Sequence, residues 1–432
     1  MKSSFQTILL VVFGFVFAGA IIIFSGLIPI GSKKADTTTP TGTVQLWGTV
    51  SRDMMRTYLD KTNLGNGNYK VTYTEHRPED LKQDLIVALA NDTPPDLIIF
   101  PSELLAQIQD KLYVIPYAAY PERTFRDTNI DGAQLFLSKN GVLAMPLVVD
   151  PLVVYYNKDL LAKSNFVIPP RTWSDLRLAG ELLTTRDSRN RFVQSAIALG
   201  TTNNITHIKD ILSAMFLQTG NAIISYDSVR DTSKVVVGAI PAGSQQAPTA
   251  QVLDFYASFS NPTNSNYSWN TALPDSLAQF LSGKSVFYIG RASELFTIQA
   301  QNPNLNFDVM ELFQTGADTR TMTFGSFMAV AMTKNAPNPV AAYAAATSMA
   351  SPIKVDALSK TLSLPPVQRS LLLSRQENPY VAVFFKAALS AFGWADPDPV
   401  LTTKIFKEMI LTVTSGRGDS TSAIYDASKE LQ

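Results

Sequence analysis

An uncharged apolar run near the amino terminus, Ile8 to Ile30, constrains this chain more than any other feature. At a helical rise of ~1.5 Å per residue the run reaches roughly 34 Å, which is enough to cross a hydrocarbon core of about 30 Å. The apolar core of a cleavable signal peptide is shorter, at about 7 to 15 residues. The run also continues through Ile21 to Phe24, directly after the small residues Ala18 to Ala20 that resemble a cleavage site. We therefore expect residues 8–30 to form an uncleaved transmembrane signal anchor.

The segments on either side of this run are short and polar. Lys2 lies on one side and Lys33 and Lys34 on the other, so the positive-inside rule leaves the orientation open. We place residues 1–7 in the cytoplasm and expect residues 31–43, which include Pro40 and lack apolar periodicity, to be a flexible linker. The predicted location is a single-pass cell-membrane protein with an extracytoplasmic folded module.

Composition bounds what the folded module can be. Of the 432 residues 46% are hydrophobic and 17% charged, which suits two or more domains with real cores. The 36 basic and 36 acidic residues balance, which removes the electrostatic argument for nucleic acid and favours a neutral ligand. The chain has no cysteine and two histidines, His76 and His207, so disulfides, thiolate chemistry, a metal site and a histidine triad are not expected. We expect no cofactor, and a surface or core position for both histidines.

Hydrophobic periodicity after the linker predicts strands that alternate with helices. Helical spacing in one segment is followed by a short apolar or alternating run in the next, a pattern typical of a sheet covered by helices. The first such segments are Val44–Trp47, Arg52–Lys61, Tyr69–Tyr73, Glu79–Ala90 and Leu97–Phe100, and later ones include Val235–Ile240 as a strand and Pro339–Met349 as a helix. Thr172 with Asp175 has the spacing of a capping box that opens a further helix. The fold class predicted is therefore α/β.

Five short stretches, in order along the chain, carry a family resemblance. They are Pro95–Ile98, the run MPLVVDPLVVYYNKDLL from Met145 to Leu161, PPRTWSDL from Pro169 to Leu176, FLSGKSVFYIG from Phe280 to Gly290, and LPP from Leu364 to Pro366. Together they resemble the family 1 extracellular solute-binding proteins, the receptor components of ABC importers related to maltose-binding protein. The resemblance covers roughly Val44 to Gln432.

That resemblance implies a type II periplasmic-binding-protein fold, in which two α/β lobes joined by a hinge close over a ligand. The first lobe would comprise residues 44–149 and 326–375, and the second residues 151–322 and 376–432. The segment from Asp150 to Asn157 would cross the hinge. Closure of such a hinge is a population shift that a ligand drives by contacting both lobes.

A sugar-binding cleft needs flat aromatic faces for the apolar side of each ring. Trp47 ends the first predicted strand and Phe100 ends a later one, where the resemblance implies cleft contacts. Trp269 lies in a polar segment, and Trp394 matches the region where the family places an aromatic platform. Each has core packing as its alternative, and we expect Trp173, in the PPRTWSDL stretch, to be structural.

The same cleft needs polar groups for the hydroxyls. Asp150 interrupts the apolar hinge run, where an unpartnered carboxylate would cost several kcal/mol, so we expect it to bind ligand or to cap hinge amides. Arg291 and Glu294 follow a strand where the family commonly has an aromatic residue, a departure that would suit an acidic sugar. Glu103 is a further candidate.

The predicted function is capture of a carbohydrate, with an oligosaccharide expected, and its delivery by a monomer to ABC permease subunits. One alternative is a tethered glycan-binding or sensory module without a transporter. The other is a glycoside-acting enzyme, for which Asp396 and Asp398 would be the carboxylate pair, although a DPDP loop is more often a helix start. No P-loop or dinucleotide fingerprint occurs, and we expect no catalysis.

Overall fold

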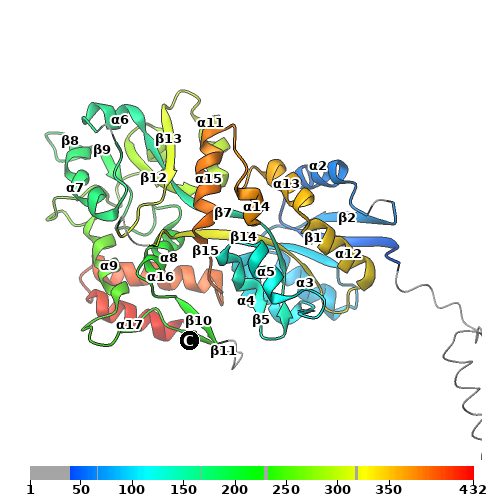
Figure 1. The fold of residues 1–432 in the computed structure, drawn as a ribbon. Helices are drawn as coiled ribbons and strands as arrows, with labels where there is room; N and C mark the ends of the chain where they lie inside the picture. The colour runs from blue at the N-terminus through cyan, green and yellow to red at the C-terminus, as the bar shows by residue number, and fades with distance from the viewer. Residues whose placement is uncertain (1–38, 66, 167, 228–231, 317–319) are drawn as a thin grey trace, which may run out of the picture. The chain divides into compact units, whose positions relative to one another are not determined.

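The computed structural model describes residues 39–432 except 66, 167, 228–231 and 317–319 (Figure 1). The predicted anchor at 8–30 and most of the predicted linker lie outside the described residues. Within the described part of the chain, no helix combines the length and the apolar character needed to cross a bilayer. The chain divides into Met1–Pro40 and Thr41–Gln432, and the fold below is that of the second unit.

One mixed sheet organises this unit. Along the described chain its strand order is β2-β1-β3-β14-β7-β12-β9-β8, with β13 also pairing with β7 and β15 with β14. β1 (Gly42–Gly48), β2 (Tyr69–Glu75) and β3 (Leu97–Pro101) are parallel to one another. β14 (Thr323–Met332) runs antiparallel to both β3 and β7 (Met145–Asn157).

β7 changes partners at the predicted hinge. Its residues up to Pro151 pair with β14, and those from Leu152 onward pair with β12 and β13. The two long strands β7 and β14 therefore join two halves of the sheet (Figure 1). We call the half built on β1–β3 the first lobe and the half built on β12, β9 and β8 the second lobe. The lobe boundaries given above remain predictions.

The first lobe draws on two distant parts of the sequence. α13, from the later part, packs against α2 from the beginning, and α12 packs on β1 and β14 (Figure 1). Besides β1–β3, its helices and strands are α2 (Arg52–Thr62), α3 (Leu81–Ala90), α4 (Leu105–Ile108), β4 (Ile115–Pro116), α5 (Glu122–Thr128), β5 (Leu137–Ser138), β6 (Gly141–Val142), α12 (Pro339–Met349), α13 (Pro352–Leu362) and α14 (Arg369–Leu372). Three 3-10 turns complete it: η1 (Ser102–Leu104), η2 (Gln109–Lys111) and η3 (Asp131–Phe136).

The second lobe carries helices from its own segment and from the carboxyl terminus. α16 packs on α8 and α9, and α15 packs on β7 and β13. Its strands are β8 (Thr185–Arg186), β9 (Phe192–Ile197), β10 (Ile224–Asp227), β11 (Thr232–Val235), β12 (Ser285–Arg291), β13 (Phe307–Glu311) and β15 (Ala391–Phe392). Its helices are α6 (Lys158–Lys163), α7 (Trp173–Leu183), α8 (Ile208–Gln218), α9 (Pro248–Ser258), α10 (Ser276–Leu281), α11 (Leu295–Gln301), α15 (Pro379–Leu389), α16 (Pro399–Thr414) and α17 (Ser420–Glu430), with the 3-10 turn η4 at Ala292–Glu294.

The interior of this unit consists of two buried hydrophobic clusters. Val153 and Tyr155 of β7 belong to one, and the alternate residues Leu152 and Val154 belong to the other. Successive side chains of a strand point to opposite faces, so this alternation shows that β7 is buried on both sides. The apolar hinge run therefore folds as a central strand.

Local signals place several helix starts where the sequence predicts them. Thr172 and Asp175 form the predicted capping box at α7, with Thr172 Oγ1 accepting from the Asp175 amide at 3.0 Å. α12 spans Pro339–Met349 as predicted, with Pro339 at its start and Asn338 as its cap. The predicted strand Val235–Ile240 is wrong: β11 ends at Val235, and the chain turns at Val237 and Gly238.

Candidate functional site

An ionic cluster joins the two lobes next to the hinge, with Arg291 at its centre. Arg291 ends β12, and its Nε and Nη2 donate to Asp210 Oδ2 of α8 at 3.0 and 2.7 Å. Its Nη2 also donates to Glu103 Oε1 of the first lobe, at 3.2 Å. Arg291 is thus held by one carboxylate from each lobe.

Glu103 is positioned by the hinge as well as by Arg291. It lies in η1, directly after β3, and its Oε2 accepts from Ser326 Oγ of β14 at 2.7 Å. Its side chain is 18% exposed and that of Arg291 25%, so the pair is shielded from solvent more than a typical surface ion pair. The Arg291–Glu103 contact therefore ties the first lobe to the second across the hinge strands.

Two further predicted carboxylates belong to the same cluster. Asp150 Oδ1 accepts from the Ser293 amide of η4 at 3.0 Å, a backbone amide outside the hinge run. Burial raises the pKa of Asp150, although Arg291 opposes the shift. Glu294 Oε2 accepts from the Arg291 amide at 2.9 Å and from Tyr288 Oη at 3.1 Å. Both carboxylates thus hold the turn that follows β12.

His207, which we expected to be a surface or core residue, lies between two of these carboxylates. Its Nδ1 is 3.6 Å from Asp210 Oδ2 and its Nε2 is 3.1 Å from Glu294 Oε1. Burial alone would lower the pKa of His207, but the bonds and charges of Asp210 and Glu294 raise it to about 9. Asp210 titrates in the opposite sense: burial opposes the shift, and Arg291 and His207 lower its pKa to about 2. Within the described residues, no group of three or more candidate ligands is arranged to hold a metal ion.

A cavity of about 570 Å³ lies between the lobes beyond this cluster. From the first lobe it is lined by residues of α4 and of the segment 134–143, and from the second by residues at the end of α8, in the β10–β11 hairpin and around Trp394. Its volume falls in the range typical of small-molecule sites. The cavity is therefore shared between the lobes.

Trp394 supplies one aromatic wall of this cavity. Its Nε1 donates to Ser213 Oγ of α8 at 3.1 Å, and its ring stacks on Phe406 with an interplanar angle of 11°. The residue is only 7% exposed, so it also belongs to the second-lobe core. A role in ligand binding remains a prediction.

Tyr226 of β10 supplies a second aromatic group. It is 43% exposed, lines the cavity, and its hydroxyl accepts from the Lys139 amide of the first lobe at 3.2 Å. The polar side chains of the lining are amides and hydroxyls, from Gln109, Gln134, Ser138 and Ser233. Among the described lining residues none is Asp, Glu, Lys, Arg or His.

α8 connects the ionic cluster to the cavity. Three of its residues lie at helical spacing on one face: Asp210, Ser213 and Leu217. Asp210 binds Arg291, Ser213 accepts a hydrogen bond from Trp394, and Leu217 lines the cavity. Asp210 and Leu217 are seven positions apart, which at ~1.5 Å per residue is about 10 Å along the helix axis. The cluster and the cavity are therefore neighbouring parts of one interlobe site.

The other predicted aromatics lie elsewhere. Phe100 is fully buried in the first-lobe core, where it packs edge-on against Phe136, and Trp269 is fully buried in the second-lobe core. Their roles in ligand binding remain predictions, as does the core-packing alternative that this burial favours. Trp47 is partly buried and its ring lies 4.3 Å from that of His76. Its place in a cleft remains a prediction.

The DPDP loop has a structural explanation. Asp396 is 2% exposed, pairs with Lys209 Nζ at 2.6 Å, and accepts from Thr402 Oγ1 at 2.9 Å. Asp398 caps α16 by accepting from two backbone amides at 3.0 Å. Both carboxylates hold the helix start that follows Trp394, as the helix-start interpretation predicts.

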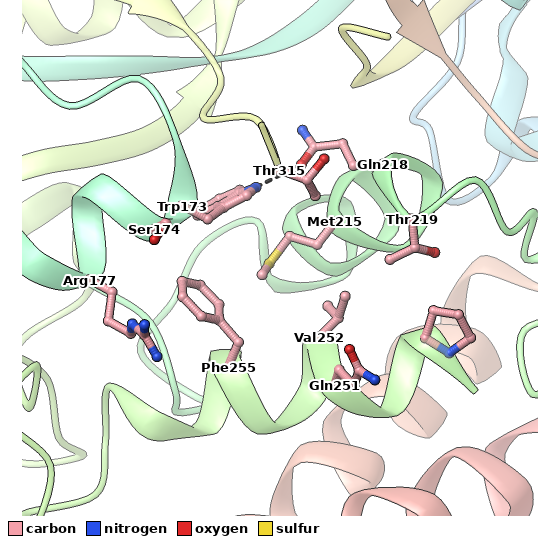
Figure 2. Close-up of a pocket in the computed structure, with 11 residues that line it drawn as sticks. Trp173, Ser174, Arg177, Met215, Gln218, Thr219, Gln251, Val252, Phe255 and Thr315 are labelled. Carbon is pink, nitrogen blue, oxygen red and sulfur yellow. Dashed lines mark hydrogen bonds between the residues drawn. The ribbon is translucent and has the colours of Figure 1, made fainter. Parts of the chain in front are cut away.

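A second cavity of about 510 Å³ lies wholly within the second lobe, between α7, α8 and α9 (Figure 2). Its lining includes Trp173, Arg177 and Phe255, and Trp173 Nε1 donates to Gln218 Oε1 at 2.7 Å. Gln218 in turn donates to the carbonyls of Phe313 and Met322 at 2.8 Å. Trp173 thus has the structural role that we expected from the sequence.

Sequence reasoning missed Asp210, His207 and Tyr226. Asp210 and His207 lie on or next to an apolar helix, and Tyr226 lies in a polar hairpin, so no local motif distinguishes them. Their partners are remote in the chain, such as Arg291 at 81 positions from Asp210 and Lys139 at 87 from Tyr226.

The fold and the interlobe site define a two-lobed receptor, and the comparisons agree. Residues 57–383 match the family model described as bacterial extracellular solute-binding protein. The chain belongs to this family. A search of curated protein sequences gives no significant match.

Solved structures of this fold are similar over most of the chain. A cyclo/maltodextrin-binding protein complexed with maltotetraose is 15% identical, with 90% of this chain and 96% of that one covered and a TM-score of 0.71. A cyclic alpha-maltosyl-1,6-maltose binding protein from Arthrobacter globiformis is 18% identical, with 90% and 97% covered and a TM-score of 0.73. A Thermus thermophilus maltotriose binding protein bound with maltotriose is 16% identical, with 90% and 98% covered and a TM-score of 0.62. At these identities the similarity establishes the two-lobed α/β fold.

Proposed function

We propose that this protein captures a neutral oligosaccharide in the cavity between its lobes. The observation that carries the proposal is the lining of that cavity: two aromatic side chains, four neutral amides or hydroxyls, and no charged side chain among the described lining residues. Aromatic faces suit the apolar sides of sugar rings, and neutral donors and acceptors suit their hydroxyls.

An acidic sugar, which Arg291 suggested from the sequence, fits this site less well. Arg291 is already bound to Asp210 and Glu103, and Asp150 and Glu294 add further carboxylates to the cluster. A uronate approaching Arg291 would have to displace one carboxylate and would face the others. The named ligands of the similar structures, which include maltotetraose and maltotriose, are neutral and support the same class.

Delivery and location are part of the proposal. The family is extracellular, which supports an extracytoplasmic binding module, and we propose that residues 8–30 anchor that module to the cell membrane. We further propose that a monomer hands its sugar to the permease of an ABC importer. A tethered glycan sensor would have the same cavity chemistry, and co-purification of permease subunits from native membranes distinguishes the two.

Thermal unfolding of the full-length protein against a ligand panel tests the proposal. The detergent must lack a sugar headgroup, and the panel contains linear malto- and mannooligosaccharides, uronic acids, polyamines and peptides. A ligand that binds only the native state at a hundredfold excess over its Kd adds about 2.7 kcal/mol of stability, which raises the midpoint by a few degrees. We expect a shift with neutral oligosaccharides, whereas a shift only with uronic acids, polyamines or peptides would overturn the carbohydrate assignment.

A further inference from the structure

Both first-lobe segments that line the cavity are bonded to the second lobe, one before and after its lining residues and the other at its start. The segment 131–139 includes the lining residues Gln134 and Ser138. Before them, Asp131 Oδ2 accepts from Arg320 Nη2 of the second lobe at 2.8 Å. After them, the Lys139 amide donates to Tyr226. This wall is therefore bonded to the second lobe both before and after its lining residues along the chain.

The other first-lobe wall is bonded to the second lobe at its start. The segment 103–109 contributes Leu105, Ala106 and Gln109 to the lining. Glu103, at its start, forms the ion pair with Arg291 described above. The second-lobe partners are Tyr226 in the β10–β11 hairpin, Arg291 at the end of β12 and Arg320 in the loop before β14. The interlobe contacts therefore do not depend on a single element.

The three interlobe contacts differ in chemistry and in exposure to solvent. Arg320 is 63% exposed, and its guanidinium also stacks on the Phe392 ring at 4.9 Å, beside the cavity residue Gly393. The Tyr226 contact joins neutral groups, whereas the Arg291 contact is shielded and anchored by Asp210. An extended ligand would break the exposed contacts more readily than the shielded one.

We propose that the cavity is a closed-ended site for a short neutral oligosaccharide, and that these interlobe contacts set the longest chain it accepts. This inference rests on the proposed function. The residues that limit the length are Tyr226 with Lys139, Arg320 with Asp131, and Arg291 with Glu103. A sugar that fits between them leaves every contact intact, and a longer one must hold the lobes apart.

Calorimetric titration with the linear series from maltose to maltoheptaose, and with the matching mannooligosaccharides, tests the proposal. The readout is the ratio between the affinity of the longest member and that of the best-bound member. For the wild type we expect the best-bound member to be short and the longest to bind at least about tenfold more weakly. Arg320→Gln, which removes an exposed end contact, should bring that ratio closer to one while short members bind as in the wild type.

The matched control is Arg417→Gln, which removes an exposed ion pair with Glu408 within the second lobe. It should leave the ratio unchanged. Affinity that stays level or rises to the longest member in the wild type would overturn the length limit while keeping the proposed function. Failure of every member of both series to bind would instead count against the proposed function.

Solution scattering of the ligand-free protein tests whether these contacts hold the lobes together in the absence of sugar. We expect the combined variant Glu103→Gln, Tyr226→Phe and Arg320→Gln to have a larger radius of gyration than the wild type. Equal radii would show that these contacts do not hold the lobes together, and would overturn the inference whatever the titrations show.

Discussion

At the scale of single residues, His207 makes the stability of the protein depend on pH above neutrality. Its pKa is about 9 in the folded chain and about 6.5 when unfolded, so its contribution is complete below about pH 6.5 and is lost as the pH rises through about 9. The rise in the pKa of His207 corresponds to about 3 kcal/mol. In denaturant titrations, His207→Gln should be less stable than the wild type at about pH 6 and should approach it at about pH 10.

The groups that face His207 are Asp210 from α8 and Glu294 from η4. His76→Gln is the control, because its ring lies in the first lobe beside Trp47 and leaves the His207 cluster intact. If His207→Gln and the wild type lose stability in parallel as the pH rises, the cluster does not hold a charged histidine.

Single residues also show where sequence reasoning stops. Arg291, Glu103, Asp150 and Glu294 were each candidates from the sequence, but their pairing with one another was not predictable. The Arg291–Glu103 contact joins residues 188 positions apart, and Trp394 meets Ser213 across 181 positions. Such contacts follow from the packing of whole elements and leave no local pattern in the chain.

At the scale of elements, Asp398 fixes the helix that follows the cavity wall. Its carboxylate accepts from the amides of Val400 and Leu401 at the start of α16. Its negative charge at the helix amino terminus also interacts favourably with the helix dipole. Asp398→Ala should lower the free energy of unfolding by about 1 kcal/mol. Sugar affinity should change little, because Asp396 still holds the loop through Lys209.

Asp426→Ala, on an exposed position of α17, is the control and should leave stability within about 0.5 kcal/mol of the wild type. A loss of sugar binding in Asp398→Ala with unchanged stability would mean that this carboxylate contacts ligand, contrary to its capping role.

Helices and strands were predictable where the local sequence contains a capping residue or a clear hydrophobic periodicity. The α7 capping box and Pro339 at the start of α12 are such signals, and both helices begin where they predict. The predicted strand Val235–Ile240 was wrong because an apolar run alone does not distinguish a strand from a turn: β11 ends at Val235, which pairs with Ile224, and the chain then turns at Val237 and Gly238. The polar sequence neighbours of Trp269 likewise do not indicate that its side chain is fully buried.

At the scale of the whole molecule, recognition and closure use different chemistry. The cavity that we propose for the sugar is neutral, whereas ion pairs account for two of the contacts that close its ends. Salt screens ion pairs far more than it weakens aromatic stacking or bonds between neutral groups. The α/β class was predictable from the alternating pattern of strands and helices. The division between a neutral cavity and ionic interlobe contacts was not, because both are formed by residues of two lobes that are distant in the sequence.

The central claim is that the sugar binds between the lobes, and Tyr226 tests it most directly. Trp394 is less suitable, because it is buried in the core and truncating it would also remove packing, whereas Tyr226 is 43% exposed. We would titrate the tightest-binding oligosaccharide of the panel into Tyr226→Ala and into Arg177→Ala, which alters the second-lobe cavity (Figure 2). Binding between the lobes predicts at least about tenfold weaker binding to Tyr226→Ala and wild-type binding to Arg177→Ala. Unchanged affinity in Tyr226→Ala, with a loss in Arg177→Ala, would contradict it.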